Sequence, residues 1–328
     1  MKRILIFSIF LLVFSPAFAV PTLPTYKIDL SSITISGVSS GAFMANQMST
    51  AFSTEFSGSA SVAGGIYWCS QGSLQKAQNE CMDMASSINS KVQVAEVKRL
   101  AAAGEIDSLE NLAKQKQFIF ASPKDSIIKP PASDKLYEFL KEFIAVENIK
   151  FDNQHQVAHG FPTLSYGANC AMGYLPWLLN CNVDTAGDIL NFMYPQLQGR
   201  IPAVAKNLFA YDQKEFGNAA TPLFANGWVY VPTSCQEGHE CKLHVALHGC
   251  QMNPDFIQDQ FAKNAGYNEW AEANGIIVLY PQSGKLGQQN PNGCWDWFGF
   301  TGPNYVTKKG KQMISLKAMI DRIVGRHP

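Results

Sequence analysis

The pentad Gly37-Val38-Ser39-Ser40-Gly41 is the stretch of this sequence that is best suited to chemistry. A serine hydroxyl is a poor nucleophile unless a base takes its proton and hydrogen-bond donors hold the oxyanion that forms. Glycines two residues before and after a serine allow the sharp strand-to-helix turn that exposes such a nucleophile. The pentad therefore predicts Ser39 as a nucleophile. Pentads of this form also arise by chance, so the surrounding sequence must agree.

A nucleophilic serine needs a histidine base and an acid that orients it, and in this motif class the acid precedes the histidine. Asp125 follows a predicted strand at 117–121, in a loop that could point a carboxylate at an imidazole. His159, in the segment AHGFPT, comes later and is the predicted base. His155 competes with it but lies in a polar run, where a solvated side chain is expected. No glutamate accompanies the two histidines as in the HExxH zinc pattern.

The oxyanion donors are predicted to be backbone N–H groups. One usually belongs to the residue after the nucleophile, here Ser40, and the other to a loop after a second strand, often with a His-Gly pair. His248-Gly249-Cys250 ends a predicted strand and is well placed for this role. It comes after the acid and the histidine in the chain rather than before them. It is either an unrelated turn or a sign that the fold is connected in a permuted order.

Predicted strands and helices alternate around these residues. A β-branched segment before the pentad favours a strand, and the segment after it is compatible with a helix. Further strands are predicted at 59–69, 117–121, 228–235, 241–250 and 276–281, and further helices at 135–146, 267–275 and 308–325. The strands at 228–235 and 241–250 read as a hairpin closed near Cys235 and Cys241. The alternation predicts an α/β fold with a mostly parallel sheet flanked by helices.

The first 19 residues have the layout of a secretory signal peptide, with Lys2 and Arg3, an apolar run, and Ala17-Phe18-Ala19 as the cleavage site. We expect residues 20–328 to form a single catalytic domain that is secreted, to the periplasm or the medium, and does not associate with a membrane after cleavage.

The sequence contains eight cysteines, and an even number in an exported chain predicts disulfide bonds. Their spacing favours pairing between neighbours, although sequence alone cannot determine connectivity. The expected pairs are Cys69 with Cys81, Cys170 with Cys181, Cys235 with Cys241, and Cys250 with Cys294. A metal site is not expected, because there is no CxxC pair with a nearby histidine set.

The composition argues against charged partners. Lys and Arg total 26, as do Asp and Glu, and only 16% of residues are charged. Without a basic block there is no indication of nucleic-acid or anionic-membrane binding. Aromatic residues make up 12% of the chain, which favours an uncharged, partly apolar partner.

Segments throughout the chain resemble the extracellular poly(3-hydroxybutyrate) depolymerases, which are α/β-hydrolase esterases, and especially their single-domain, circularly permuted form. The similar segments are TISGVSSGAFMANQM, GGIYWC, the Asp125 loop, AHGFPT, LHVALHGCQMNP, NGIIVLYPQS and NPNGCWDWFG. The resemblance implies Ser39, His159 and Asp125 as the catalytic triad, and the N–H groups of Ser40 and Cys250 as oxyanion donors. It implies no cofactor.

These observations lead us to expect a monomeric serine esterase that hydrolyses a short-chain polyester or oligoester through an acyl-enzyme. One alternative is a carboxylesterase for feruloyl or acyl groups on a polysaccharide, and another is a binding protein that has lost catalysis. The segment CWDWFGFTG is turn-flanked, so Trp295 or Trp297 is expected to line the substrate cleft, with Trp295 favoured by its adjacency to Cys294.

Overall fold

The computed structural model describes residues 20–218 and 220–326. The predicted signal peptide, residues 1–19, lies outside the described residues. Within them, no helix is both long enough and apolar enough to cross a bilayer.

The core of the molecule is an eight-stranded sheet with the strand order β4-β3-β2-β1-β10-β11-β9-β8. The strands from β4 to β11 in this order are parallel, and β9 and β8 are antiparallel to their neighbours. The sheet strands are β1 (Thr34–Val38), β2 (Gly58–Val62), β3 (Lys116–Phe120), β4 (Ile149–Asp152), β8 (Leu208–Asp212), β9 (Asn226–Tyr230), β10 (Lys242–Leu247) and β11 (Ile276–Tyr280). The expected mostly parallel sheet is confirmed.

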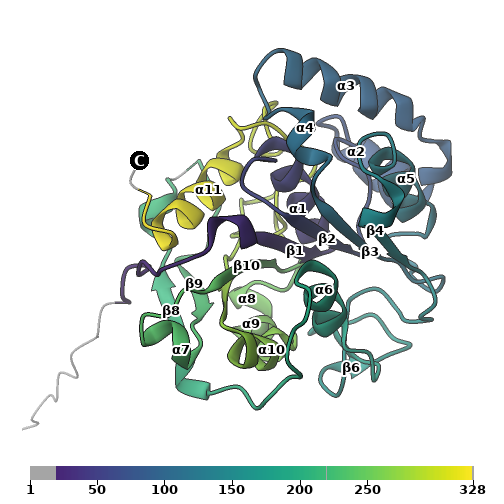
Figure 1. Cartoon of the computed structure of the whole chain (residues 1–328). Coiled ribbons are helices and arrows are strands. Elements are labelled where there is room, and N and C mark those ends of the chain that lie inside the picture. Colours follow the sequence, from purple (N-terminus) through teal and green to yellow (C-terminus); the bar gives the residue numbers. More distant parts are fainter. Residues whose placement is uncertain (1–19, 219, 327–328) are drawn as a thin grey trace, which may run out of the picture.

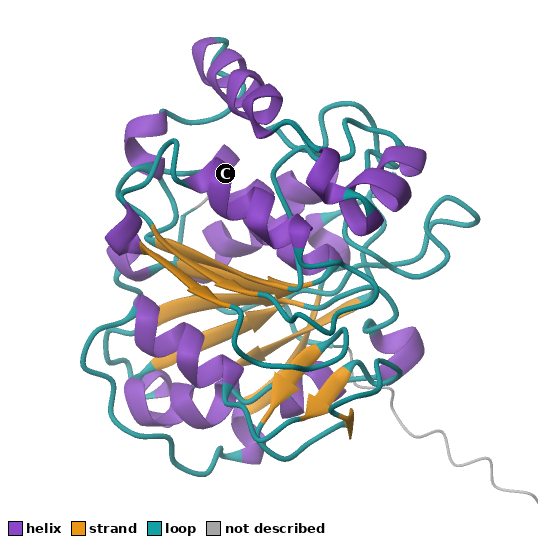
Figure 2. Cartoon of the chain, turned by 90° about the vertical axis from the view of Figure 1, so that its right-hand side faces the viewer, coloured by secondary structure: helices purple, strands orange, loops and turns teal. Residues whose placement is uncertain are grey.

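Helices cover both faces of this sheet, as the two views show (Figures 1 and 2). In Figure 1, α1, α3, α5 and α11 lie above the strands, and α6 and α10 lie below them. The helices are α1 (Ser40–Ala51), α2 (Leu74–Lys76), α3 (Ser90–Ala102), α4 (Leu109–Leu112), α5 (Pro131–Leu140), α6 (Thr185–Met193), α7 (Thr233–Gln236), α8 (Pro254–Ile257), α9 (Gln260–Asn264), α10 (Tyr267–Asn274) and α11 (Lys311–Ile323).

The two layers bury alternate side chains of the same strands. In β10, Leu243, Val245 and Leu247 belong to the core under α1 and α11, whereas Ala246 belongs to the core on the opposite face, with α6 and α10. Successive side chains of a strand point to opposite faces, so a strand covered on both sides buries every side chain. Polar side chains are buried in these strands too, and His244 of β10 is hydrogen-bonded to Thr34 and Ser36 of β1.

The predicted hairpin between 228–235 and 241–250 is wrong. β9 pairs with β8 and β11, whereas β10 pairs in parallel with β1 and β11. β10 is buried from Leu243 to Leu247, and a strand buried on both faces belongs in the middle of the sheet. The short connection still carries a disulfide, Cys235–Cys241, but it leads from β9 across the position of β11.

A second, three-stranded sheet follows β4, with the strand order β5-β7-β6. Its strands are β5 (Phe161–Thr163), β6 (Ala168–Asn169) and β7 (Leu178–Asn180). The Cys170–Cys181 disulfide closes this unit, and the Ala158 N–H donates to the carbonyl of Cys170 at 2.9 Å. The small sheet thereby holds the chain on both sides of His159.

The cysteines form four disulfides between neighbours in the sequence, the pairs that the spacing favours. They are Cys69–Cys81, Cys170–Cys181, Cys235–Cys241 and Cys250–Cys294.

Candidate active site

Ser39 sits at the sharp turn between β1 and α1. Its φ of 55° and ψ of −121° place a non-glycine residue in a region that most side chains avoid. A Cβ at Gly37 would collide with the carbonyl of Gly41, and a Cβ at Gly41 would collide with the carbonyls of Leu247 and His248. The glycines are therefore required because backbone segments touch at this turn, as the pentad predicts.

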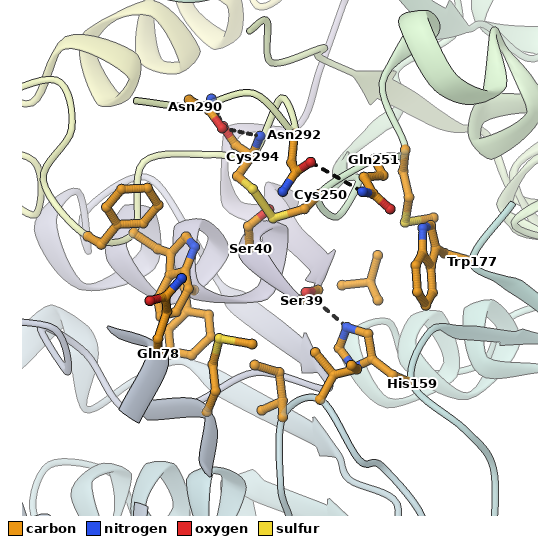
Figure 3. A pocket seen from close by; sticks show the side chains of 18 of the residues that line it. Ser39, Ser40, Gln78, His159, Trp177, Cys250, Gln251, Asn290, Asn292 and Cys294 are labelled. Atoms are coloured by element: carbon orange, nitrogen blue, oxygen red, sulfur yellow. Dashed lines mark hydrogen bonds between the residues drawn. A yellow bond between two sulfur atoms is a disulfide. The ribbon is translucent and has the colours of Figure 1, made fainter. Parts of the chain in front are cut away.

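The structure brings Ser39, His159 and Asp125 into one chain of hydrogen bonds (Figure 3). His159 Nε2 lies 3.0 Å from Ser39 Oγ, and His159 Nδ1 lies 2.8 Å from Asp125 Oδ2. Both the histidine and the aspartate are buried. When Nδ1 carries the ring proton and donates a hydrogen bond to the carboxylate, Nε2 is free to accept the serine proton.

Asp125 is oriented by its own loop, which follows β3. Its Oδ1 accepts hydrogen bonds from the N–H groups of Ile127 and Ile128, both at 2.9 Å. The second oxygen is thereby directed at His159. His155, the other candidate for the base, makes different contacts. Its Nε2 lies 3.5 Å from Asp152 Oδ2, and its ring stacks on Phe120.

The predicted oxyanion donors lie beside the nucleophile. Ser40 is the first residue of α1, so its N–H belongs to the positive end of the helix dipole, which lies beside Ser39. Cys250 follows β10, which pairs with β1, and both Ser40 and Cys250 line the same cavity as Ser39. Figure 3 shows Ser40 and the Cys250–Cys294 disulfide on one side of Ser39 and His159 on the other.

The cavity at Ser39 has a volume of about 430 Å³. No Asp, Glu, Lys or Arg occurs among the described residues that line it; apart from the serines and His159, its polar side chains carry Gln and Asn amides and the indole N–H groups of two tryptophans. One wall comes from Leu74, Gln78 and Met82, in the segment tied by Cys69–Cys81. Such a site fits an uncharged ligand with hydrogen-bond acceptors.

The two tryptophans near Cys294 lie in different places. Trp295 has no exposed surface and packs against His248, with ring centroids 5.5 Å apart. Trp295 does not line the cavity, so the prediction that favoured Trp295 over Trp297 as the cleft residue is wrong. Its backbone N–H donates to Ser40 Oγ at 3.3 Å, which anchors the segment with that ring turned inward. Trp297 does line the cavity and stacks on Phe43 at 4.5 Å.

Sequence reasoning missed Trp177, which stands on the His159 side of the cavity (Figure 3). The two rings meet edge to face with centroids 6.1 Å apart. The sequence signal that could have found Trp177 is the cysteine pair at 170 and 181. A disulfide between them closes a loop that contains Trp177 and starts soon after His159, so this loop must stay near His159.

A family model described as Esterase PHB depolymerase matches residues 228–327. The poly(3-hydroxybutyrate) depolymerase of Delftia acidovorans is 38% identical over 314 residues, which are 93% of this chain and 62% of that protein. The chain thus spans less than two thirds of that relative. The polyhydroxybutyrate depolymerase of Talaromyces funiculosus is 32% identical, with 93% of each chain covered.

Two solved structures are similar over the whole fold. The crystal structure of PHB depolymerase from Penicillium funiculosum has a TM-score of 0.85 and 31% identity, covering 93% of this chain and 99% of that one. A PHB depolymerase complexed with an R3HB trimer gives the same TM-score and coverage at 30% identity. The α/β-hydrolase fold is confirmed, and the chain belongs to the PHB depolymerase family of esterases.

Proposed function

We propose that this protein is a secreted serine esterase that hydrolyses the ester bonds of poly(3-hydroxybutyrate), or of related short-chain polyesters and oligoesters, through an acyl-enzyme. The observation that carries the proposal is the hydrogen-bonded series Ser39–His159–Asp125 at the wall of an uncharged cavity. A polyester presents carbonyl acceptors and short apolar side chains but no charge along its length. Apolar walls with amide groups match that chemistry.

The geometry supports a two-step mechanism. Ser39 Oγ attacks the ester carbonyl as His159 Nε2 takes its proton, and the N–H groups of Ser40 and Cys250 hold the oxyanion. The intermediate collapses when the protonated His159 gives its proton to the leaving alcohol oxygen, which leaves the acyl group on Ser39. A water molecule then attacks the acyl carbonyl, giving one proton to Nε2, and the acid product departs as that proton returns to Ser39.

Three further points belong to this proposal. The four disulfides support export to an oxidising compartment, where such bonds persist. The strand order supports a permuted connectivity, because β1, which leads directly to Ser39, pairs with β10 from the C-terminal part of the chain. All three triad side chains come from one chain, which supports a catalytic domain at 20–328 that acts as a monomer.

The test is product analysis with the purified protein beginning at residue 20. It is incubated with poly(3-hydroxybutyrate), with soluble hydroxybutyrate oligomers and with a feruloylated polysaccharide, and released products are identified by mass spectrometry. We expect hydroxybutyrate monomers and short oligomers, and their loss after treatment with a serine-directed inhibitor. Release of ferulate alone would show a carboxylesterase of the other kind. The absence of any ester cleavage would show a binding protein.

A further inference from the structure

The peptide between Gly249 and Cys250 is held by a side chain that does not line the cavity. The carbonyl oxygen of Gly249 lies 2.7 Å from Nδ1 of His248, the residue immediately after β10. The His248 side chain has no exposed surface and packs against Trp295. The N–H of this same peptide belongs to Cys250, one of the two oxyanion donors in the proposed function.

A second contact determines which nitrogen of His248 carries the proton. The backbone N–H of Ser283 points at Nε2 of His248 at 3.0 Å, so Nε2 must act as an acceptor. Burial lowers the pKa of His248 to about 4, which keeps the ring neutral. A neutral imidazole has one N–H, and here it is on Nδ1, where it donates to the Gly249 carbonyl.

Ser283 is also connected to Cys250, which belongs to the loop at residues 248–250, here called the oxyanion loop. Its hydroxyl donates to the carbonyl of Cys294 at 2.7 Å, and Cys294 is bonded to Cys250. The contacts therefore form a closed ring that runs from His248 through Gly249 and Cys250 to Cys294, then through Ser283 back to His248. The imidazole holds the carbonyl end of the peptide, and the disulfide holds the following side chain.

We propose that His248 is a positioning residue for the oxyanion hole: its Nδ1–H holds the Gly249 carbonyl toward the core and so directs the Cys250 N–H toward Ser39. In a trans peptide the C=O and N–H groups point in opposite directions. The imidazole of His248 lies on the core side of this peptide, and Cys250 lies on the cavity wall. A Cβ on Gly249 would stand 3.1 Å from Ser39 Cβ, so the peptide passes directly beside the nucleophile.

This inference rests on the proposed esterase function and predicts a specific kinetic effect. The oxyanion exists only in the transition state and the tetrahedral intermediate. A misdirected Cys250 N–H should therefore lower kcat and leave KM nearly unchanged. Complete loss of one donor costs about 10²–10³-fold in kcat, so misorientation should cost roughly 10- to 100-fold.

The kinetic experiment compares two substitutions that each keep one function of the ring. In His248→Asn the amide N–H can replace Nδ1–H as donor to Gly249, whereas in His248→Gln the amide oxygen reaches the Nε2 position and accepts from Ser283. Both are assayed on a minimal soluble ester and for affinity toward a trifluoromethyl ketone, which forms a tetrahedral adduct with an oxyanion. We expect His248→Gln to lose kcat and ketone affinity in parallel, and His248→Asn to retain most of both.

The matched control is His244→Gln. His244, within β10, is also a buried histidine, and it bonds to Thr34 and Ser36, away from the oxyanion loop. Its substitution should lower the thermal unfolding temperature without lowering ketone affinity per folded molecule. Equal kinetic losses in His248→Asn and His248→Gln, or an equal loss of ketone affinity in the control, would overturn the positioning role.

Crystal structures of the two His248 variants decide the same question without any activity. We expect the Gly249–Cys250 peptide to be rotated in His248→Gln and retained in His248→Asn. An unrotated peptide in His248→Gln would overturn the inference whether or not the enzyme cleaves esters. If the normal protein cleaves no ester, the proposed function fails, and these two structures still show whether His248 directs the Cys250 N–H.

Discussion

At the scale of single residues, one hydroxyl joins the loops that carry Asp125 and His159. Ser122 Oγ donates to the carbonyl of Val157 at 2.6 Å and accepts from the N–H of the same residue at 2.9 Å. Ser122 lies in the Asp125 loop, and Val157 precedes His159 by two residues. The Ser122 side chain therefore holds the loop that carries Asp125 against the segment that carries His159.

The proposed triad predicts unequal effects for the two neighbouring histidines. Ser39→Ala and His159→Ala should each lower kcat by at least roughly 10⁴-fold on a soluble ester, because members of a triad act as a unit. His155→Ala should be nearly fully active, since its ring contacts Phe120 and Asp152 and not Ser39. Circular dichroism should show all three variants folded. An inactive His155→Ala beside an active His159→Ala would reverse the assignment of the base.

The aromatic residues of the cavity predict a substrate-length effect. Trp177→Ala should lose more rate on a long hydroxybutyrate oligomer than on a minimal ester, because Trp177 lies beside His159 on the cavity wall. The control is Trp295→Ala, which removes a fully buried ring and should cost about 3–5 kcal/mol of stability. Initial rates on both substrates and thermal unfolding separate these effects. Parallel losses on both substrates for Trp177→Ala would show that this ring is not a substrate contact.

At the scale of elements, the site exists because β1 and β10 are neighbours in register. Thr34 is paired with His244 and Gly37 with Leu247, so the two strands end side by side. The turn after β1 presents Ser39, and the loop after β10 presents Cys250. Ligand sites of open parallel sheets lie at these carboxyl ends of the strands, and both proposed oxyanion donors come from them.

The Cys250–Cys294 disulfide should contribute to both stability and rate. It closes a loop of 44 residues, for which the chain-entropy treatment predicts about 4 kcal/mol. The double variant Cys250→Ser/Cys294→Ser should lose stability of this order and also kcat, because the oxyanion loop is freed on one side.

The matched control is Cys235→Ser/Cys241→Ser, whose 6-residue loop predicts only about 2 kcal/mol. This bridge closes the connection between β9 and β10 away from the cavity, so kcat should be unchanged. Urea unfolding and ester kinetics on both double variants make the comparison. Unchanged kcat in the Cys250→Ser/Cys294→Ser variant would show that the disulfide does not position the donor.

At the scale of the whole molecule, two buried histidines make stability depend on pH. Burial lowers the pKa of His244 to about 3 and that of His248 to about 4, from an ordinary value of 6.5. Below pH 6.5 the unfolded chain binds protons that the folded protein does not. The free energy of unfolding should therefore be fully present above pH 6.5 and fall as the pH is lowered toward 4, by up to roughly 1.4 kcal/mol per pH unit for each histidine.

Urea unfolding at several values between pH 4.5 and pH 7 checks this, with His244→Gln as the comparison. The variant should be less stable near neutrality but should show a shallower decline toward acid, because one proton-binding group is absent from its unfolded state. A decline as steep as that of the normal protein would show that His244 does not contribute.

By itself the sequence determined the fold class and predicted the residues of the proposed triad. The pentad predicted the turn at Ser39 because only glycines allow backbone segments to touch there, and the collisions at Gly37 and Gly41 give the reason in atoms. The spacing of the cysteines favoured the four bridges that form. The alternation of strands and helices predicted a mostly parallel sheet. These are local signals, and each depends on residues close together in the chain.

Only the tertiary structure decided which distant segments meet. The hairpin prediction for 228–250 failed because the partner of a buried strand is chosen by burial of both its faces and not by proximity in the chain, so β10 pairs with β1 and not with β9. The inward turn of Trp295, the place of Trp177 and the contact of His248 with the Gly249 carbonyl likewise depend on packing between segments far apart. A sequence pattern indicates whether a residue is polar or apolar and which local structure it favours. The direction of its side chain depends on the neighbours that pack against it in the fold.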